Sequence, residues 1–284
     1  MRKPQWITVV IAVLLLFILY FFGKTIPPKK PVKQGMPASV PEIKVISADS
    51  VIIMAKKELN PDQLKRVTDL EGILTTNSSE KYEQIKNYHQ LAHYWLDSVG
   101  IFEPYAWYEA EAARLENSEK TLTFAAHLFL ENLQSDNIDE RRKWKALQAK
   151  DLFERSLILN PGNDSSKVGL GACYLFGNIS AVPMEGILKI REVAERDSLN
   201  VYAQLTLAKG AIISGQYDKA INRLLTVNRL QENNIEAILL LADLYERTGD
   251  KDHAINWYNK GLKYIKREDA RTDIETRIRE LKKQ

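Results

Sequence analysis

Apolar residues recur at helical spacing from about residue 44 to the carboxyl end of the chain. No segment alternates apolar and polar residues for long enough to predict a β-strand. Proline removes a backbone donor and marks helix boundaries. The prolines of this region fall between the helical segments, and they are Pro61, Pro104, Pro161 and Pro183. The pattern therefore predicts an all-α body.

A different pattern occupies the amino terminus. Residues 1–5 form a short basic tail, and Trp6–Phe22 is an apolar run without a charge. As a helix this run rises about 26 Å, which approaches the roughly 30 Å of a bilayer core once Gly23 and the snorkelling side chain of Lys24 are included. A cleaved signal peptide is the alternative, but the run lacks the small-x-small site of such peptides. We expect a single transmembrane anchor over residues 6–23.

The segments that flank the helical body differ from it in composition. Residues 24–43 hold five of the ten prolines and several lysines, which predicts a semi-rigid linker. Residues 44–79 are expected to form an amino-terminal helical cap, and residues 269–284 a carboxyl-terminal capping helix with one apolar face.

Self-similarity over 34 residues is the clearest signal in the body. Small and bulky residues recur at this distance in the pairs Leu207 and Leu241, Ala208 and Ala242, Gly215 and Gly249, Ala220 and Ala254, Leu224 and Tyr258. The alanines let two antiparallel helices approach closely, and the glycines allow the tight turn between them. Bulky residues, Tyr245 among them, fill the space between neighbouring helix pairs.

A 34-residue helix-turn-helix with this spacing resembles the tetratricopeptide repeat (TPR) family of the membrane-anchored bacterial type. The resemblance implies a solenoid of helical hairpins, a right-handed superhelix, with about five pairs over residues 80–268. The segments 201–234 and 235–268 match best, whereas Ser135–Lys145 is an insertion relative to the family pattern. The acids of this insertion are expected to form a solvated loop, and they are Asp136, Asp139 and Glu140.

Charge and cysteine content narrow the class of protein. The formal net charge is +3, but six basic residues lie within the first 33 positions, and the remainder carries 34 basic and 37 acidic residues. Such a body lacks the electrostatic attraction that nucleic acid requires, so no nucleic-acid partner is expected. The single cysteine, Cys173, excludes an internal disulfide and is expected to be a core thiol.

The histidines are the only candidates for chemistry. His89 and His93 stand four apart, as in half of a zinc-protease motif, but Gln90 occupies the place of the required glutamate. By the family pattern these histidines and His127 face the concave groove. A metal-binding or enzymatic protein that uses the three histidines stays an alternative. We expect no catalytic residue, bound metal, cofactor, small-molecule substrate or enzymatic activity.

The sequence favours a membrane-tethered scaffold that binds a peptide or helix of a partner protein in the groove. The expected groove residues are Lys86, His89, His93, Lys120, His127, Leu205, Lys209, Leu239, Asp243 and Glu246. A structural subunit of a membrane complex is a further alternative. The basic start before the apolar run favours a bacterial inner-membrane protein with a periplasmic body over a cytoplasmic one, although the charges on the two sides are nearly balanced.

Overall fold

The computed structural model of the protein describes residues 46–76, 80–180 and 183–283. The predicted anchor and linker lie outside these residues. Within the described ranges, no helix combines the length and apolarity needed to cross a bilayer.

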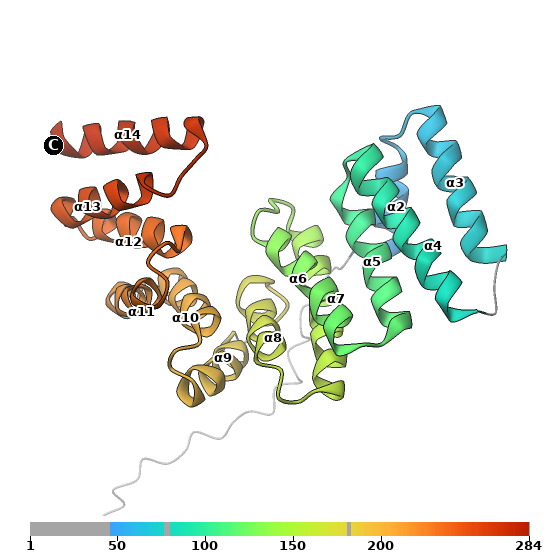
Figure 1. Ribbon diagram of the computed structural model, residues 1–284, viewed down its shortest axis with the longest axis horizontal. Helices are drawn as coiled ribbons and strands as arrows, with labels where there is room; N and C mark the ends of the chain where they lie inside the picture. Colours follow the sequence, from blue (N-terminus) through green and yellow to red (C-terminus); the bar gives the residue numbers. More distant parts are fainter. Residues whose placement is uncertain (1–45, 77–79, 181–182, 284) are drawn as a thin grey trace, which may run out of the picture. The chain divides into compact units, whose positions relative to one another are not determined.

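The described residues form α-helices, one π-helical segment and no strand (Figure 1). The helices are α2 (Ala48–Lys56), α3 (Pro61–Thr76), α4 (Lys81–His93), α5 (Phe102–Glu116), α6 (Glu119–Leu133), α7 (Asp139–Leu159), α8 (Asp164–Phe176), α9 (Met184–Arg196), α10 (Val201–Ile213), α11 (Tyr217–Leu230), α12 (Ile235–Arg247), α13 (Lys251–Leu262) and α14 (Glu268–Lys283). The π-helical segment Tyr94–Val99 continues α4.

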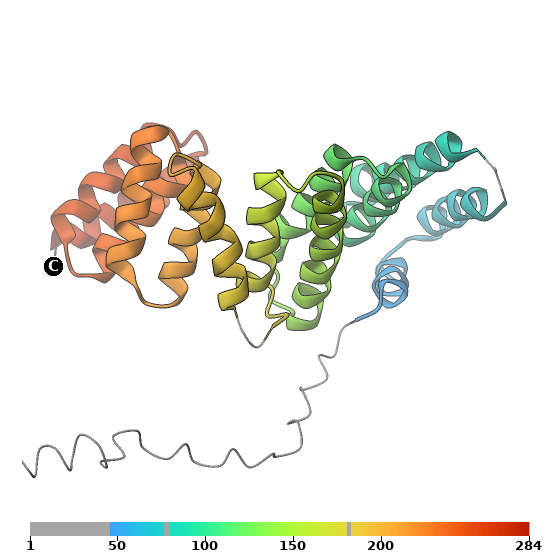
Figure 2. The ribbon, with the colours of Figure 1, turned by 90° about the horizontal axis from the view of Figure 1, so that it is seen from below.

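Consecutive helices from α4 to α13 lie side by side as five hairpins, α4 with α5, α6 with α7, α8 with α9, α10 with α11 and α12 with α13 (Figures 1 and 2). Each hairpin also packs on the next one along the chain. A hairpin cannot bury both of its faces alone, so the hydrophobic core is continued from one pair to the next. The prediction of an all-α array of helical hairpins is confirmed.

Local signals set the ends of these helices. Gly215 and Gly249 have φ of +71° and +84°, the left-handed backbone that ends α10 and α12 before their turns. At the other end, Asn163, Asn200 and Asn234 each accept a backbone N–H from the first turn of α8, α10 and α12 at 2.9 Å. The asparagine caps therefore repeat with the hairpins.

The helices α8 and α9 pack closely against each other. A Cβ on Gly186 would lie 2.4 Å from the backbone oxygen of Gly171, and a Cβ on Gly171 would lie 2.5 Å from the Ile190 side chain. Gly169, on another side of α8, faces the ring of Phe153 in α7. Because contacts this short leave no room for a side chain, the glycines of α8 form a small packing face.

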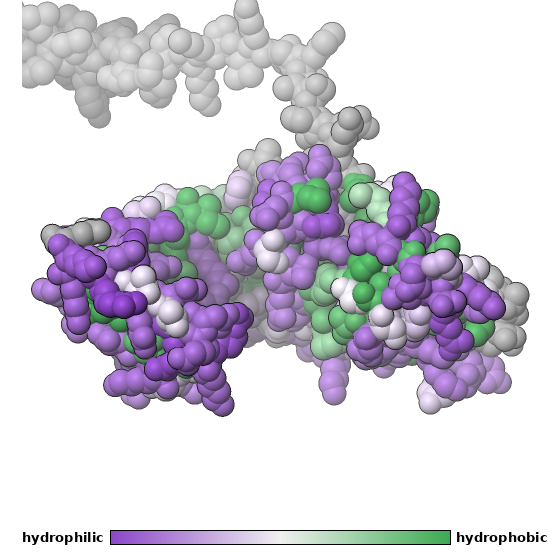
Figure 3. Space-filling model, turned by 90° about the horizontal axis from the view of Figure 1, so that it is seen from above, coloured by the Kyte–Doolittle hydropathy of each residue, from purple (hydrophilic) through white to green (hydrophobic). Residues whose placement is uncertain are grey.

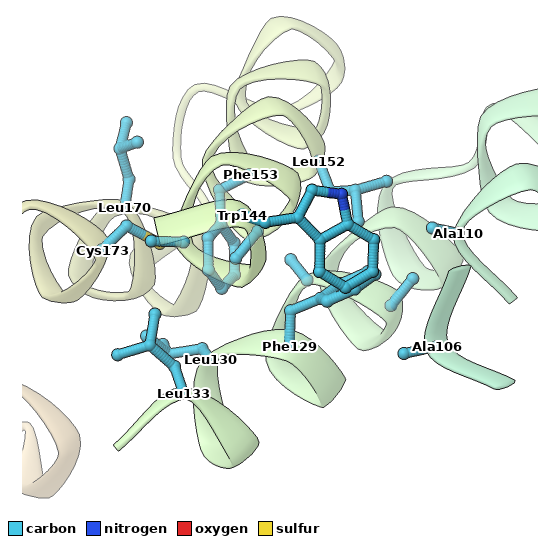
Figure 4. Close-up of a cluster of buried hydrophobic side chains, with 14 of the residues drawn as sticks. Ala106, Ala110, Phe129, Leu130, Leu133, Trp144, Leu152, Phe153, Leu170 and Cys173 are labelled. Carbon is cyan, nitrogen blue, oxygen red and sulfur yellow. The ribbon is translucent and has the colours of Figure 1, made fainter. Parts of the chain in front are cut away.

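The largest core cluster joins α5, α6, α7 and α8 (Figure 4). Trp144 lies at its centre and meets the edge of Phe129 with ring centroids 5.4 Å apart. Cys173 is fully buried in the same cluster, and burial raises the pKa of its thiol. A buried thiol with a raised pKa is a core residue rather than a nucleophile.

The expectation that the acids of the insertion form a solvated loop is wrong for Asp136, whereas Glu140 is exposed on the first turn of α7. The helix α7 begins at Asp139, so most of the insertion lengthens this helix. Asp136 is buried rather than solvated, and its carboxylate lies 2.7 Å from the Nζ of Lys145, whose side chain is only 1% exposed. Lys145 also lies 2.7 Å from the carboxylate of Glu103 in α5, and Arg141 lies 2.6 Å from Asp136. The inserted residues thus form a buried ion network that ties α7 to α5.

The network predicts a pH dependence of stability. Burial alone would raise the pKa of Asp136, but hydrogen bonds from Arg141 and Lys145 outweigh burial and lower it from 3.8 to about 2. The stability that ionised Asp136 contributes is therefore fully present above its ordinary pKa of 3.8. It is lost as the pH falls through about 2. We expect Asp136→Asn to be less stable than the wild type at neutral pH, and the difference to shrink between about pH 4 and pH 2. Urea denaturation of both proteins across this pH range measures the difference in stability. A difference that does not change with pH would contradict the lowered pKa of Asp136.

Additional helices cover both ends of the array. The helix α3 packs on α4 and α2 on α5, where Glu71 binds Lys56 at 2.5 Å and accepts the hydroxyl of Tyr108 at 2.8 Å. At the other end α14 packs on α13 and buries Ile278 and Leu281. On the face drawn in Figure 3, polar residues predominate and hydrophobic residues form separate patches among the described residues. A broad apolar patch that would mark a docking face is not seen on this side of the described part.

Candidate peptide-binding groove

The first helices of four consecutive hairpins, α6, α8, α10 and α12, line an open groove of about 440 Å³. Its lining comprises His127, Leu130, Glu131, Gln134, Ala172, Phe176, Tyr202, Thr206, Lys209 and Glu236. Residues of one helix that point into the groove are three or four positions apart, as in Tyr202, Thr206 and Lys209 of α10. The groove is therefore produced by the repeat itself, one helix face per hairpin.

Aromatic side chains form one side of the groove. The rings of His127 and Tyr202 have centroids 5.6 Å apart, and His127 also meets the edge of Phe153 at 5.1 Å. Burial raises the pKa of Tyr202, so its phenol stays protonated and is available as a donor. Phe176 of α8 is half-buried beside them.

His127 is held by a hydrogen bond between its Nε2 and the hydroxyl of Ser165, 2.8 Å away. Burial lowers the pKa of this histidine, although Glu131 opposes the shift. The ring is therefore neutral at neutral pH, and it supplies an aromatic surface with one occupied nitrogen.

Charged side chains of both signs border the groove. Lys209 of α10 forms an ion pair with Glu236 of α12. Glu131 of α6 is exposed, and its carboxylate makes no hydrogen bond or ion pair with the part of the chain that the structure describes. A ligand in the groove could therefore contact an aromatic surface, the ammonium group of Lys209 in place of Glu236, and the unpaired carboxylate of Glu131.

Solved structures give the fold a name. TTC0263, a thermophilic TPR protein of Thermus thermophilus, superposes with a TM-score of 0.52 over 69% of this chain and 98% of its own, at 16% identity. The chain has the tetratricopeptide-repeat fold. At this identity the likeness shows the fold alone.

Two further TPR structures are similar over comparable lengths. MamA from residue 41 onward, from Desulfovibrio magneticus RS-1, covers 66% of this chain and 97% of its own at 20% identity and a TM-score of 0.44. YrrB, described as a TPR protein with an unusual peptide-binding site, covers 72% of this chain and 96% of its own at 15% identity and a TM-score of 0.41. No protein-family model matches the chain, and no curated protein matches it.

The structural positions of the TPR pattern lie where the fold requires them. Ala208, Ala220, Ala242 and Ala254 are fully buried between helices. Tyr258 is buried as well, and its hydroxyl donates 2.6 Å to Asp243 and 3.0 Å to Glu246. These contacts fix the last TPR hairpin, α12 with α13, from within.

The predicted groove residues are divided among several places in the TPR array. His127 and Lys209 line the groove. Leu205 and Leu239 are half-buried and pack against the cores of the last two hairpins. Lys120 in α6 is exposed and lies outside the lining. The role of all ten residues in binding stays a prediction.

Asp243 and Glu246 belong to a different pocket of about 340 Å³ at the carboxyl end. Glu246 forms an ion pair with Arg277, so its carboxylate ties the capping helix α14 to the last TPR hairpin. Because this acid already has two partners in Arg277 and Tyr258, we expect it to stabilise the cap.

The remaining candidates lie in the first TPR hairpin and have partners of their own. The Nδ1 of His89 is 2.9 Å from the buried carboxylate of Glu109, and the Nδ1 of His93 is 3.3 Å from Asp97. Lys86 is 3.3 Å from Glu83. In the described residues no three His, Cys, Asp or Glu side chains gather as a metal site would require. The histidine alternative thus gains no geometric support there.

Sequence reasoning missed most of the groove lining. Leu130, Phe176 and Tyr202 are apolar or aromatic, and such residues at helical spacing are expected in a core. The signal that identifies them is their position on the first helix of each hairpin.

Proposed function

We propose that this protein is a membrane-tethered scaffold that binds a peptide or a helix of a partner protein in the groove between α6 and α12. The observation that carries the proposal is the lining of the groove, to which four consecutive hairpins contribute aromatic side chains and charges of both signs. A groove built from repeated helices presents an extended surface of the kind that solenoid proteins use for protein ligands. The tether rests on the apolar run at residues 6–23.

The lining indicates the chemistry of the ligand. Aromatic and aliphatic anchors such as Phe176 and Leu130 favour an apolar side chain of the ligand. Glu131 and Lys209 favour a ligand with charges of both signs. A short amphipathic helix or an extended peptide carries both kinds of group. The proposed role is binding without chemistry, since the one thiol is buried and the histidine of the groove is neutral and hydrogen-bonded.

Site-specific photo-crosslinking in cells tests the proposal. We expect a photoreactive amino acid at Gln134, an exposed lining residue, to give a discrete adduct with a partner protein. The same amino acid at Ile158 of α7, which is 79% exposed and outside the groove, serves as the control. Equal adducts at the two positions, or none at Gln134, would count against binding in the groove.

Charge reversal in the groove should then weaken the identified partner. We expect Lys209→Glu and Glu131→Lys each to lower affinity about tenfold, because each replaces an attractive contact to a charged group with a repulsive one. Lys263→Glu, the same change as Lys209→Glu at an exposed site just after α13, should alter affinity less than about twofold. Calorimetry with the purified partner measures all three, and equal affinities would refute the assignment of this surface.

A further inference from the structure

A third pocket, of about 230 Å³, lies between α8, α9, α10 and α11. It shares no lining residue with the groove described above. One part of its lining is apolar and another part is basic, and the two parts come largely from different helices.

The apolar part includes Leu175 at the end of α8, Met184 and Ile187 in the first turn of α9, and Leu207 in α10. Gly210 lets the Leu175 side chain approach α10, because a Cβ at that position would lie 2.7 Å from it. Met184 is 53% exposed at the rim. Methionine adapts its shape to a ligand more readily than branched side chains do.

The basic part consists of Arg191 in α9 with Lys219 and Arg223 in α11. Arg223 donates 2.7 Å to the side-chain oxygen of Gln204, and Lys219 donates 2.7 Å to that of Gln216. Both acceptors are neutral amides. Among the described residues that line this pocket there is no aspartate or glutamate, so the three cations have no anion between them.

The electrostatics of the pocket favour an anion. Burial lowers the pKa of Arg223, the positive charge of Arg191 lowers it further, and Glu195 outside the lining only partly offsets them. Two guanidinium groups that repel each other in a partly desolvated site are stabilised by a carboxylate, which can accept parallel hydrogen bonds from an arginine.

We propose that this pocket binds an acidic segment of a protein, with an aliphatic or aromatic side chain against Leu175, Met184 and Ile187 and an adjacent carboxylate on Arg191 and Arg223. The three unpaired cations and the apolar side chains that line the pocket together select this occupant. An anionic bilayer would instead require a broad basic face with protruding apolar residues. The site is separate from the groove and does not depend on its ligand.

Fluorescence anisotropy with the full-length chain in nanodiscs of neutral phosphatidylcholine tests the proposal. The probe is a labelled hexapeptide with a central Leu-Phe pair and two acidic residues on each side. A matched peptide replaces every acid by its amide. We expect saturable binding of the acidic peptide and at least about tenfold weaker binding of the amide peptide, since hydrogen bonds to charged groups supply the difference.

Variants separate this pocket from the groove. Arg191→Glu at the exposed edge should weaken the acidic peptide about tenfold. Lys189→Glu, on the same helix but outside the lining, should change its binding less than about twofold. The groove variant Lys209→Glu should leave peptide binding unchanged, so failure of one site is distinguishable from failure of the other.

Three results would overturn the inference. The first is equal binding of the acidic and amide peptides, and the second is an Arg191→Glu variant that binds like the wild type. The third is association of wild-type nanodiscs, but not of Arg191→Glu nanodiscs, with phosphatidylserine vesicles in the absence of peptide binding. That result would assign the pocket to a lipid surface instead.

Discussion

Replacing Lys145 with methionine is expected to lower the free energy of unfolding by about 3–5 kcal/mol. The Nζ of Lys145 lies between the carboxylates of Asp136 and Glu103, 2.7 Å from each, and 2.5 Å from the amide oxygen of Asn132. The lysine side chain and Asp136 are each only 1% exposed. Removing the cation leaves two acids in a poorly hydrated site with Arg141 as their remaining nearby cation. Urea denaturation followed by tryptophan fluorescence measures the loss.

Lys150→Met, about one and a half turns further along α7, is the matched control for this substitution. Lys150 pairs with Glu154 at 2.8 Å, and both side chains are partly exposed. Such i,i+4 pairs contribute about 0.3–0.5 kcal/mol, so the control should be nearly as stable as the wild type. A Lys145→Met variant no less stable than Lys150→Met would show that the network contributes little.

The second large effect is expected where the backbones of α8 and α9 approach each other closely. Gly186→Ala should destabilise the protein by about 1–3 kcal/mol or more, because the added methyl group meets backbone that cannot rotate away. The new Cβ would lie 2.4 Å from the oxygen of Gly171 and 2.8 Å from the Cβ of Tyr174. Relief requires α8 and α9 to separate, which would open the packing of Ile190 as well.

Gly72→Ala in α3 is the control for the glycine substitution. A Cβ added at Gly72 would have no atom from another part of the described structure within 4 Å. Alanine in a helix interior loses less backbone entropy on folding than glycine, so this variant should gain about 0.5–1 kcal/mol. Opposite signs of the two changes in urea denaturation are the expected result. A Gly186→Ala variant as stable as the wild type would show that the two helices are not held this closely.

Both effects arise from contacts between residues that are distant in the sequence. Contacts of this kind were not predicted from the sequence, whereas the helical hairpins were. The hairpins were predictable because their signals are local and periodic. Gly215 and Gly249 are required where the backbone turns left-handed, and Ala208 and Ala242 are required where two helices touch. Those requirements recur every 34 residues and can be read without knowledge of any distant partner.

The burial of Asp136 was not predictable in this way. A stretch with alternating acids and bases is typical of a solvated loop, and a carboxylate is rarely buried without ion-pair or hydrogen-bond partners. The central cation of Asp136 is Lys145, whose other carboxylate ligand, Glu103, comes from the preceding hairpin. Only the packing of α7 on α5 decides that these three residues meet.

The groove shows the same division. The sequence alone determined that helices pair in an array, where two of the turns lie and that His127 and Lys209 are on the first helices of their hairpins. The tertiary structure decided that Tyr202 and Phe176 line a groove while Leu205 and Leu239 pack into cores. The physical reason is that helical periodicity fixes the face on which a side chain lies, whereas the neighbouring hairpins determine which parts of that face they cover.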